Sequence, residues 1–409
     1  MYNKKTYCPM PFVTMTVNPG NYISRCMMSH KSMGEIQSKT LQNLAFETLR
    51  SNMLNGVWDK EGCKVCYSRE NANLDSQRLK WLKNEKIYLD EEGIYERNIN
   101  LSRNKIYHLY LNFSNICNFK CRMCGPHFSN AWLSDHSKLL EKGIYKEIKN
   151  TSLIIPPKSQ VDIDKFLLEF GNDLQNLRQI WITGGEPFID NKLFDFFEKL
   201  GSYADVKNIK VSINTNGSKL DVNKLKILRN LKQIVINFSV DAVGDLYKYM
   251  RGYNYDFKEI DKKINTCLKL QNEQNNLNIA VNGTYQLYNI LNVEDFWLWG
   301  KKVANSKKGN WIEYRTLSGP NFLAARHAPL TVKNKAIKIL QKLIDDDKDF
   351  SHNHYLQQAI CECKLNAVPE YIKKFVNFNN ALDNIRNEKL NDYCEFLLKG
   401  WSEEGNLDE

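Results

Sequence analysis

Apolar and polar residues follow a repeating order of strand and helix over the middle of the chain. Short apolar runs of strand length begin near residue 105 and end near residue 317, and amphipathic stretches of helical spacing separate them. This order predicts parallel strands that are joined by helices. The six predicted strands are residues 106–113, 179–185, 210–217, 233–241, 277–287 and 311–317.

Six strand–helix units predict an α/β fold, and they suit a partial (β/α)6 TIM-like barrel. An open doubly wound sheet has the same pattern and stays an alternative. In both architectures ligands bind at the carboxyl ends of the strands. The loops at these ends hold the cysteines Cys117, Cys121 and Cys124, and also the segments Gly184-Gly185-Glu186, Asn216-Gly217 and Ser239–Asp241. We therefore expect the functional site at this edge of the sheet.

The regions on either side of the predicted barrel have different patterns. Residues 1–100 form a cysteine-rich module with a hairpin around Asn18-Pro19-Gly20 and a helix over residues 41–56. The barrel takes residues 101–320, and residues 321–409 form a helical C-terminal region. The N-terminus has no apolar signal region and no long apolar run follows, so we expect no membrane span and a cytoplasmic protein.

Composition places the chain among ordinary globular proteins. Hydrophobic residues make up 42% and charged residues 25% of its 409 residues, so we expect a large folded core. The net charge of +10 is spread along the chain without a basic block. This favours a solvated basic surface over a nucleic-acid site.

The eleven cysteines are the most informative residues. Many lie in tight C-x-C or C-x2-C pairs, which favours metal or cluster ligation over disulfides. Four of them can form one site in the N-terminal module, with Cys8 and Cys26 at the ends of the hairpin and Cys63 and Cys66 in a C-x2-C loop. Zinc and an iron–sulfur cluster both fit four thiolates at this spacing.

The remaining cysteines divide into a second cluster site and isolated residues. Cys117, Cys121 and Cys124 follow the first predicted strand with the spacing C-x3-C-x2-C. Three thiolates can reach one [4Fe–4S] cluster, which normally takes four, so one iron stays open to another ligand. Cys267 lies mid-helix among apolar residues and is predicted to be a core residue. Cys361 and Cys363 form a C-x-C pair that helical spacing points to different faces, so we do not expect them or Cys394 to share a ligand site; one cysteine near the cavity as a hydrogen-atom donor is the alternative.

CNFKCRMC, followed about sixty residues later by TGGEP, resembles the radical S-adenosylmethionine (SAM) superfamily over residues 105–320. The resemblance implies that Cys117, Cys121 and Cys124 bind three irons of a [4Fe–4S] cluster and that SAM chelates the fourth. It also implies reductive cleavage of SAM to a 5′-deoxyadenosyl radical, which abstracts hydrogen from a substrate. The electron donor would be a protein such as flavodoxin or ferredoxin.

The same resemblance implies a set of SAM contacts. Gly184 and Gly185 would let the backbone approach the methionine amino group, and Glu186 would suit its charge. Arg251 would pair with the methionine carboxylate. Met123 stands where many members have an aromatic residue beside the adenine. Candidates for hydrogen bonds to the ribose or the carboxylate are Asn214, Asn216, Ser239 and Asp241.

The N-terminal module resembles radical enzymes with a twitch-type auxiliary cluster, close to the SPASM type. The shared features are C-P-x-P-F, a cysteine after a turn and strand, and C-x2-C followed by Glu and by Ser76-x-Arg78. Met27 replaces a second cysteine that often follows Cys26 in these proteins. This resemblance favours a second [4Fe–4S] cluster over zinc at Cys8, Cys26, Cys63 and Cys66.

The resemblance leaves the substrate open, and the sequence identifies no catalytic side chain. A peptide or protein is the first hypothesis, because related enzymes with auxiliary clusters often modify peptides. A sugar, nucleoside or small amine is the second. A non-catalytic zinc or iron–sulfur module is the alternative from another class, and it leaves TGGEP unexplained.

Overall fold

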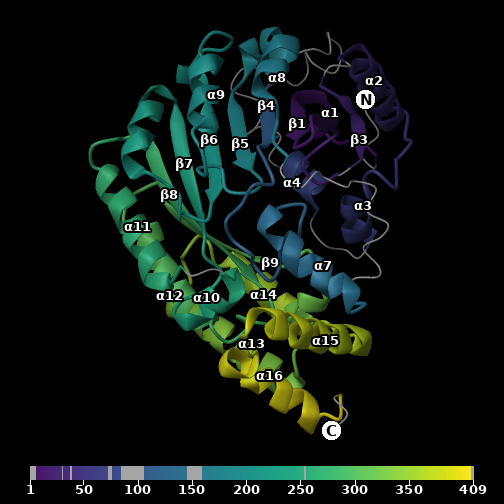
Figure 1. Cartoon of the computed structure of the whole chain (residues 1–409), viewed down its shortest axis with the longest axis vertical. Helices are drawn as coiled ribbons and strands as arrows, with labels where there is room; N and C mark the ends of the chain where they lie inside the picture. The colour runs from purple at the N-terminus through teal and green to yellow at the C-terminus, as the bar shows by residue number, and fades with distance from the viewer. Residues whose placement is uncertain are drawn as a thin grey trace. The chain divides into compact units, whose positions relative to one another are not determined.

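The computed structural model describes residues 6–29, 31–36, 39–71, 76–83, 106–144, 159–252 and 255–406 (Figure 1). Its strands form a sheet in the order β3-β2-β1-β4-β5-β6-β7-β8-β9. Three strands come from the N-terminal module: β1 (Thr14–Asn18), β2 (Tyr22–Ser24) and β3 (Ser32–Glu35). The other six are β4 (His108–Asn112), β5 (Gln179–Thr183), β6 (Lys210–Thr215), β7 (Gln233–Ser239), β8 (Leu277–Tyr285) and β9 (Trp311–Thr316).

All six strands predicted from the apolar runs are present, and the α/β class with a parallel sheet is confirmed. β4 pairs in parallel with β5, β5 with β6, and β8 with β9. The N-terminal hairpin joins the same sheet, because β1 pairs in parallel with β4, with Leu109 opposite Met15. β1 and β2 are antiparallel, as the Asn18-Pro19-Gly20 turn predicts.

Helices follow the strands along the chain. α7 (Leu133–Glu141) comes after β4, α8 (Ile163–Phe170) precedes β5, and α9 (Lys192–Leu200) follows it. The segment after β6, η5 (Val222–Asn230), is a 3-10 helix. Then come α10 (Asp245–Arg251), α11 (Phe257–Leu270) and α12 (Val293–Asn305). α11 begins with a capping box of Asp256 and Glu259, and its apolar stripe at Ile260, Ile264 and Cys267 is buried.

The C-terminal region is helical, as predicted, and comprises α13 (Leu330–Asp346), α14 (His354–Lys364), α15 (Pro369–Arg386) and α16 (Asn391–Glu403). α15 starts with Pro369 in its first turn and ends at Asn387, whose left-handed backbone (φ +54°) closes the helix. These helices contact one another, α12 and β9. Trp401 is fully buried among them and donates its indole N–H to the His327 carbonyl at 2.9 Å.

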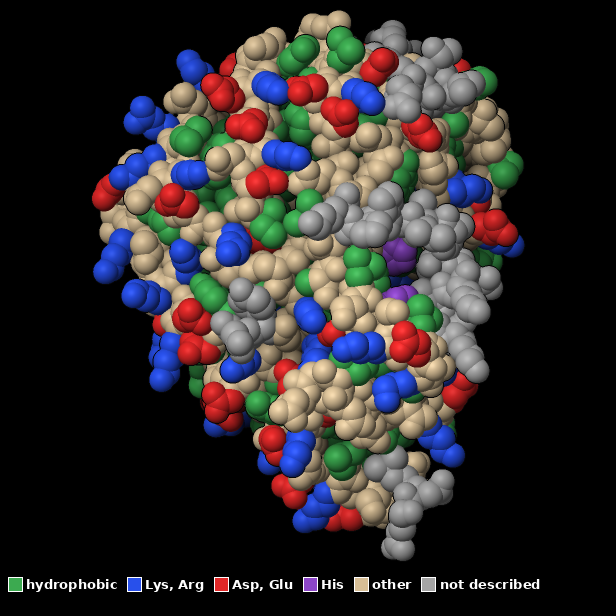
Figure 2. Space-filling model, in the orientation of Figure 1, with side chains coloured by type: hydrophobic (Ala, Val, Ile, Leu, Met, Phe, Trp, Pro, Cys, Tyr) green, Lys and Arg blue, Asp and Glu red, His purple; other side chains and the backbone are tan. Residues whose placement is uncertain are grey.

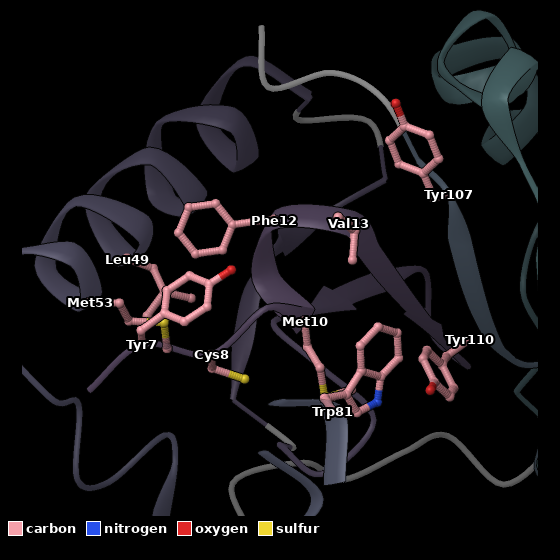
Figure 3. Close-up of a cluster of buried hydrophobic side chains, with 10 residues drawn as sticks. All are labelled: Tyr7, Cys8, Met10, Phe12, Val13, Leu49, Met53, Trp81, Tyr107 and Tyr110. Atoms are coloured by element: carbon pink, nitrogen blue, oxygen red, sulfur yellow. The ribbon is translucent and has the colours of Figure 1, made fainter. Parts of the chain in front are cut away.

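The N-terminal module has its own helices and core. They are α1 (Met10–Val13), α2 (Lys39–Leu54), α3 (Lys64–Asn71) and α4 (Gln77–Lys83). Figure 3 shows the core, in which Tyr7, Met10, Met53 and Trp81 pack around α1 beside Cys8. Burial of these large apolar side chains stabilises the module and fixes the backbone at Cys8.

By its internal contacts the chain divides into two compact units. The first contains residues 1–115, 158–213 and 227–234, and the second contains residues 116–157, 214–226 and 235–409. On the face in Figure 2, Lys and Arg side chains are interspersed with Asp and Glu. Among the described residues, no helix combines the length and the apolar character that a membrane span needs.

Candidate functional site

The loop after β4 carries the three cysteines Cys117, Cys121 and Cys124 in the second unit. The Cys117 sulfur accepts hydrogen bonds from the Phe119 N–H at 3.4 Å and from the Asn216 side-chain amide at 3.8 Å. The Cys124 N–H donates to the Cys121 carbonyl at 2.9 Å, so the last two cysteines share one tight turn. The loop therefore presents its sulfurs from a hydrogen-bonded backbone.

The charge state of this turn favours metal binding. The pKa of Cys121 falls to about 7, because the Cys124 thiol hydrogen-bonds its sulfur, against the effect of burial, and because the Arg251 cation lies nearby. The same hydrogen bond and burial raise the pKa of Cys124. Since iron binds thiolates, a cysteine with a pKa near 7 is a ready first ligand. The donor set fits an iron–sulfur cluster.

Arg251 is the buried cation of the loop. It ends α10, and its Nη1 forms an ion pair with Asp241 at 2.7 Å. The other carboxylate oxygen of Asp241 accepts the Thr284 N–H at 2.8 Å, so both oxygens are already engaged. The Nε atom of Arg251 is buried and lacks a hydrogen-bond partner among the described residues. An N–H in this position fits an anionic ligand group such as a carboxylate.

Two predicted contacts lie beside the cysteines, and a third group was missed by the sequence analysis. Asn216 bonds Cys117 and also the Asn118 side-chain carbonyl oxygen at 3.1 Å, and Ser218 bonds both asparagines. Met123 accepts a hydrogen bond on sulfur from the Gln286 amide at 3.4 Å. Asn118 stands in the CNFKCRMC motif directly after Cys117 but was not expected as a contact, whereas Ser218 and Gln286 lie outside the motifs, after strand ends.

The TGGEP segment follows β5 in the first unit. Gly184 and Gly185 have positive φ angles of +83° and +54°. A Cβ on Gly184 would lie 2.7 Å from the Ser114 carbonyl oxygen, so only glycine fits there. Glu186 is fully buried, and its carboxylate accepts the Phe188 N–H at 3.1 Å. The segment is thus a fixed turn rather than a loose loop.

The strand-end candidates Asn214 and Ser239 are half-buried and lie near the ends of β6 and β7. Asp241 has a positive φ of +69° and is held by Arg251 and Thr284. In this arrangement Asp241 orients Arg251, and its own contact with a ligand stays a prediction. The contacts of Asn214 and Ser239 with a ligand stay predictions.

The profile of the radical SAM superfamily matches residues 111–286, a span that contains the three cysteines, TGGEP, Asp241 and Arg251. The matched span is a radical SAM domain. Members of this superfamily use a [4Fe–4S] cluster together with SAM. The match begins in β4 and ends just after β8, so it leaves out both the N-terminal module and the C-terminal helices.

Curated relatives include two bacterial enzymes named GTP 3′,8-cyclase. The one from Alkaliphilus oremlandii is 27% identical over 207 residues, which cover 50% of this chain and 53% of the relative. The one from Vibrio atlanticus is 28% identical over 179 residues, 43% of this chain and 46% of the relative. The chain thus spans about half the length of the curated relatives it matches.

Solved structures of radical SAM proteins also align with this chain. Native anSMEcpe with bound AdoMet aligns at 17% identity and a TM-score of 0.38, with 59% of this chain and 61% of that chain covered. SuiB from Streptococcus suis, bound to S-adenosylmethionine, aligns at 14% identity and a TM-score of 0.35, with 76% and 63% covered.

Outside the region that matches the superfamily, four cysteines line one pocket of the N-terminal module. They are Cys8, Cys26, Cys63 and Cys66. Burial, and the proximity of Cys26, raise the pKa of Cys8; burial raises that of Cys26 to about 12. Among the described residues no three Cys, His, Asp or Glu side chains form a group arranged to hold a single metal ion.

Arg25 is a buried cation at this pocket. Its side chain is 3% exposed and pairs with Asp59 at 2.7 Å. A Cβ on Gly62 would lie 2.3 Å from the Arg25 guanidinium carbon, so the glycine before Cys63 lets the cation reach the loop. Arg25 also hydrogen-bonds the Cys63 sulfur, which opposes the rise in the Cys63 pKa caused by burial. The pocket therefore contains positive charge beside its thiols.

The Ser76-x-Arg78 motif supports the same pocket. Arg78 donates to the Tyr7 carbonyl at 2.9 Å, next to Cys8, and to the Glu70 carboxylate at 3.0 Å. Ser76 also bonds Glu70, at 2.5 Å. The motif thus ties α3 and α4 to the segment that carries Cys8.

The remaining cysteines include three buried ones, and the burial of Cys267 is as predicted. Cys267 packs in the α11 core, Cys363 lies 3.2 Å from the Tyr285 hydroxyl, and Cys394 donates to the Tyr288 carbonyl at 3.4 Å. Cys361 is exposed, whereas Cys363 is buried, as expected for a C-x-C pair on a helix. On α14 its two-residue spacing from Cys363 turns it to another face of the helix.

Proposed function

We propose that the chain is a radical SAM enzyme that holds a [4Fe–4S] cluster on Cys117, Cys121 and Cys124 and binds SAM at the open iron. When bound, the reduced cluster and SAM supply a 5′-deoxyadenosyl radical that abstracts hydrogen from the substrate. The observation that carries the proposal is the buried Arg251, whose Nε lacks a partner among the described residues beside thiols of which one has a pKa near 7.

The protein's own residues bind and orient the cofactors. Arg251 donates from Nε to the methionine carboxylate, while Asp241 fixes its guanidinium by the 2.7 Å ion pair. The Gly184-Gly185 backbone and Glu186 receive the methionine amino group. Within the second unit Arg251 is held by Asp241, and within the first unit Glu186 accepts the Phe188 N–H, so each group is oriented inside its own unit.

Met123 and Gln286 are proposed to contact the adenine. The Gln286 amide N–H is engaged by the Met123 sulfur, and its carbonyl oxygen is buried without a hydrogen-bond partner among the described residues. That oxygen can accept a hydrogen bond from an exocyclic amino group. The thioether packs against an aromatic ring in place of the aromatic residue of other members.

We also propose that Cys8, Cys26, Cys63 and Cys66 hold a second [4Fe–4S] cluster. Two observations support it: the four cysteines line one pocket, and the buried Arg25 offers positive charge to an anionic cluster. Four protein thiolates leave no open iron, so this cluster suits electron relay or substrate-side structure. Zinc at this pocket is the alternative outcome of a metal analysis.

A peptide or protein is proposed as the substrate, and a nucleotide is the second candidate. The β8–β9 surface opposite α12 is polar: Asn282 pairs in register with Glu313, and Thr284 with Arg315. Glu313 and Arg315 form an ion pair at 2.8 Å. Amide, hydroxyl and ionic groups in this order suit the alternating donors and acceptors of a peptide. The name of the relatives, GTP 3′,8-cyclase, favours the nucleotide.

Anaerobic reconstitution with iron and sulfide tests the proposal. We expect about eight irons per chain, because two cubane clusters hold four irons each, and 5′-deoxyadenosine on reduction with SAM. Reduced flavodoxin or ferredoxin should replace the chemical reductant. About four irons together with bound zinc would mean that only Cys117, Cys121 and Cys124 hold an iron–sulfur cluster and that the four N-terminal cysteines hold zinc. Zinc alone, without cleavage of SAM, would refute the proposed function.

The substrate is tested with the same reconstituted enzyme. The neighbouring genes are first searched for a short peptide gene. GTP and each peptide found in this way are then added separately, and substrate consumption is measured by mass spectrometry. We expect a peptide mass change coupled to 5′-deoxyadenosine formation. Conversion of GTP without modification of the peptide would replace the peptide hypothesis by the nucleotide hypothesis.

A further inference from the structure

A polar stripe runs along the buried face of α15, outside the span that matches the superfamily. Asn379, Asp383 and Arg386 are spaced by four and three residues, so they share one side of the helix. Asn379 is fully buried, Asp383 is 7% exposed, and the side chain of Arg386 is 7% exposed. Buried polar side chains cost free energy unless they find partners, so the partners of this stripe indicate its role.

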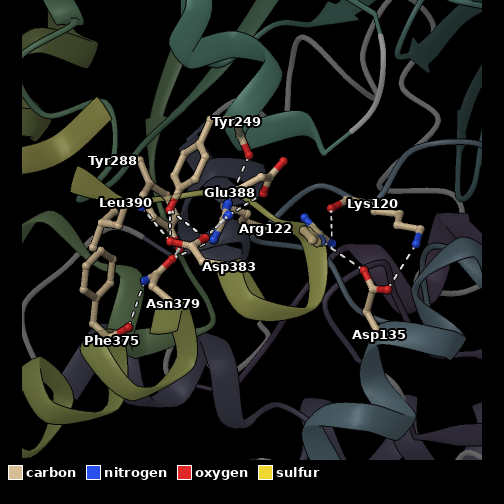
Figure 4. A network of polar contacts seen from close by, with 11 residues as sticks. Lys120, Arg122, Asp135, Tyr249, Tyr288, Phe375, Asn379, Asp383, Glu388 and Leu390 are labelled. Atoms are coloured by element: carbon tan, nitrogen blue, oxygen red, sulfur yellow. Dashed lines mark hydrogen bonds and ion pairs between the residues drawn. The ribbon is translucent and has the colours of Figure 1, made fainter. Parts of the chain in front are cut away.

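The stripe binds the two residues on either side of Cys121 (Figure 4). Asp383 forms an ion pair with Arg122, and the Asn379 carbonyl oxygen accepts a second hydrogen bond from the same guanidinium at 2.8 Å. Arg386 donates to the Lys120 carbonyl at 2.8 Å. One helix therefore holds the loop immediately before and after its central cysteine.

Cys121 itself is held through Trp132. The Trp132 indole N–H donates to the Cys121 carbonyl at 2.8 Å. The Trp132 ring is fully buried and stacks on Phe378 of α15, with a centroid distance of 6.4 Å, and the Arg386 guanidinium lies 4.8 Å from its centre. Three consecutive residues of the loop thus depend on α15.

Arg122 extends the same contact to α10. Its backbone N–H donates to the Met250 carbonyl at 2.8 Å, and its Nε donates to the Tyr249 carbonyl at 3.1 Å. The next residue after Met250 is Arg251. A Cβ on Gly252 would lie 2.4 Å from the Lys120 carbonyl oxygen, so the end of α10 is in close contact with the loop.

From these contacts we infer that α15 positions the cluster-binding loop relative to Arg251, with Asn379, Asp383 and Arg386 as positioning residues. The helical C-terminal region thereby sets the geometry in which SAM is bound. The effect of α15 on SAM binding rests on the proposed function. The effect of α15 on the conformational order of the loop without ligands does not rest on it.

The test compares Asp383→Asn with Glu362→Gln in the full-length protein. The two carboxylate oxygens of Asp383 accept the Leu390 N–H at 2.6 Å and the Tyr249 hydroxyl at 3.2 Å. In Asp383→Asn an amide NH₂ replaces one of these acceptors, and Arg122 keeps only Glu388 as a charged partner. Glu362 is the matched control, because it is also 7% exposed and pairs with Arg326 at 2.7 Å in the same region, away from the loop.

Hydrogen exchange of the ligand-free protein gives the first readout. We expect residues 117–124 to exchange at least tenfold faster in Asp383→Asn and at the wild-type rate in Glu362→Gln. Because the exchange measurement needs neither iron nor SAM, it tests the role of α15 even if the proposed function is wrong. Unchanged exchange in Asp383→Asn, or equal acceleration in both variants, would overturn the inference. If Asp383→Asn does not fold, Arg386→Gln is read by the same criteria.

The reconstituted enzyme gives the second readout. We expect Asp383→Asn to keep its iron content and to raise the KM for SAM at least fivefold, with a smaller change in kcat, because Arg251 is displaced. The change in the electron paramagnetic resonance spectrum of the cluster on addition of SAM should shrink. If wild type and Asp383→Asn share the same KM and spectral response, α15 has no positioning role towards SAM.

Discussion

Replacement of Arg122 by methionine tests how strongly the C-terminal helices hold the cluster loop. The side chain of Arg122 is fully buried and pairs with Asp383, which is 9% exposed at its side chain, and with Glu388 at 2.5 Å. Its guanidinium carbon lies 3.6 Å from the centre of the Tyr249 ring. Methionine keeps the apolar stem of the side chain and removes the charge and all four polar contacts, with Asp383, Glu388, Asn379 and the Tyr249 carbonyl.

The magnitude follows from the carboxylates that remain. Loss of one partner of a buried ion pair costs about 3–5 kcal/mol. Asp383 keeps the Leu390 N–H at 2.6 Å and the Tyr249 hydroxyl at 3.2 Å, and Glu388, with 25% of its side chain exposed, can regain water. The remaining hydrogen bonds of Asp383 and the hydration of Glu388 bring the expected loss of stability to the lower end of this range. We therefore expect the free energy of unfolding to fall by about 3 kcal/mol.

Urea unfolding followed by circular dichroism measures this loss. The Arg122→Met/Asp383→Asn double variant should regain roughly 1–2 kcal/mol, because it no longer buries an unpaired carboxylate. Arg326→Met serves as control; its arginine is 34% exposed, and we expect a cost of about 1 kcal/mol. A loss below about 1 kcal/mol in Arg122→Met would refute the reasoning.

Three further predictions concern other parts of the chain. Gly184→Ala places a methyl group 2.7 Å from a backbone oxygen at a residue with positive φ. Calorimetry should therefore find at least tenfold weaker binding of SAM, with the iron content unchanged. The control is Gly201→Ala, whose new Cβ lies 3.5 Å from its nearest neighbour, and this variant should bind SAM normally. Burial lowers the pKa of His327 to about 4, and its Nδ1 accepts the Val368 N–H. The folded state therefore binds fewer protons than the unfolded state between pH 4 and 6.5. The urea midpoint of unfolding should fall as the pH drops through this window, and it should fall less in His327→Gln. Arg25→Gln removes a buried cation from the four-cysteine pocket, and redox titration should find a lower midpoint potential for that cluster; an unchanged potential would contradict the electrostatic role.

The strands and the cluster motifs could be predicted from the sequence because their signals are local. Each strand from β4 to β9 is an apolar run of strand length, and the three cysteines lie within eight residues. The glycines of TGGEP were expected to allow close approach, and the positive φ of Gly184 agrees with this. The span that matches the radical SAM superfamily, residues 111–286, contains those same cysteines and glycines.

The contacts that hold the site could not be predicted because they join distant parts of the chain. Arg122 lies between two motif cysteines, yet its partner Asp383 is 261 residues away in a helix without a motif. Gln286 and Asn118 look like ordinary loop residues until the fold brings them to Met123 and Asn216. The addition of the N-terminal hairpin to β4 was also hidden, because strand pairing across 94 residues leaves no local pattern.

The central claim is that the three-cysteine loop cleaves SAM and that the N-terminal cysteines serve a separate site. Its most direct test is 5′-deoxyadenosine formation by reconstituted wild type, Cys121→Ala and Cys63→Ala under a strong reductant. We predict that Cys121→Ala forms none, whereas Cys63→Ala binds less iron and still cleaves SAM. Cleavage by Cys121→Ala at the wild-type rate, or complete loss in a folded Cys63→Ala, would contradict the account.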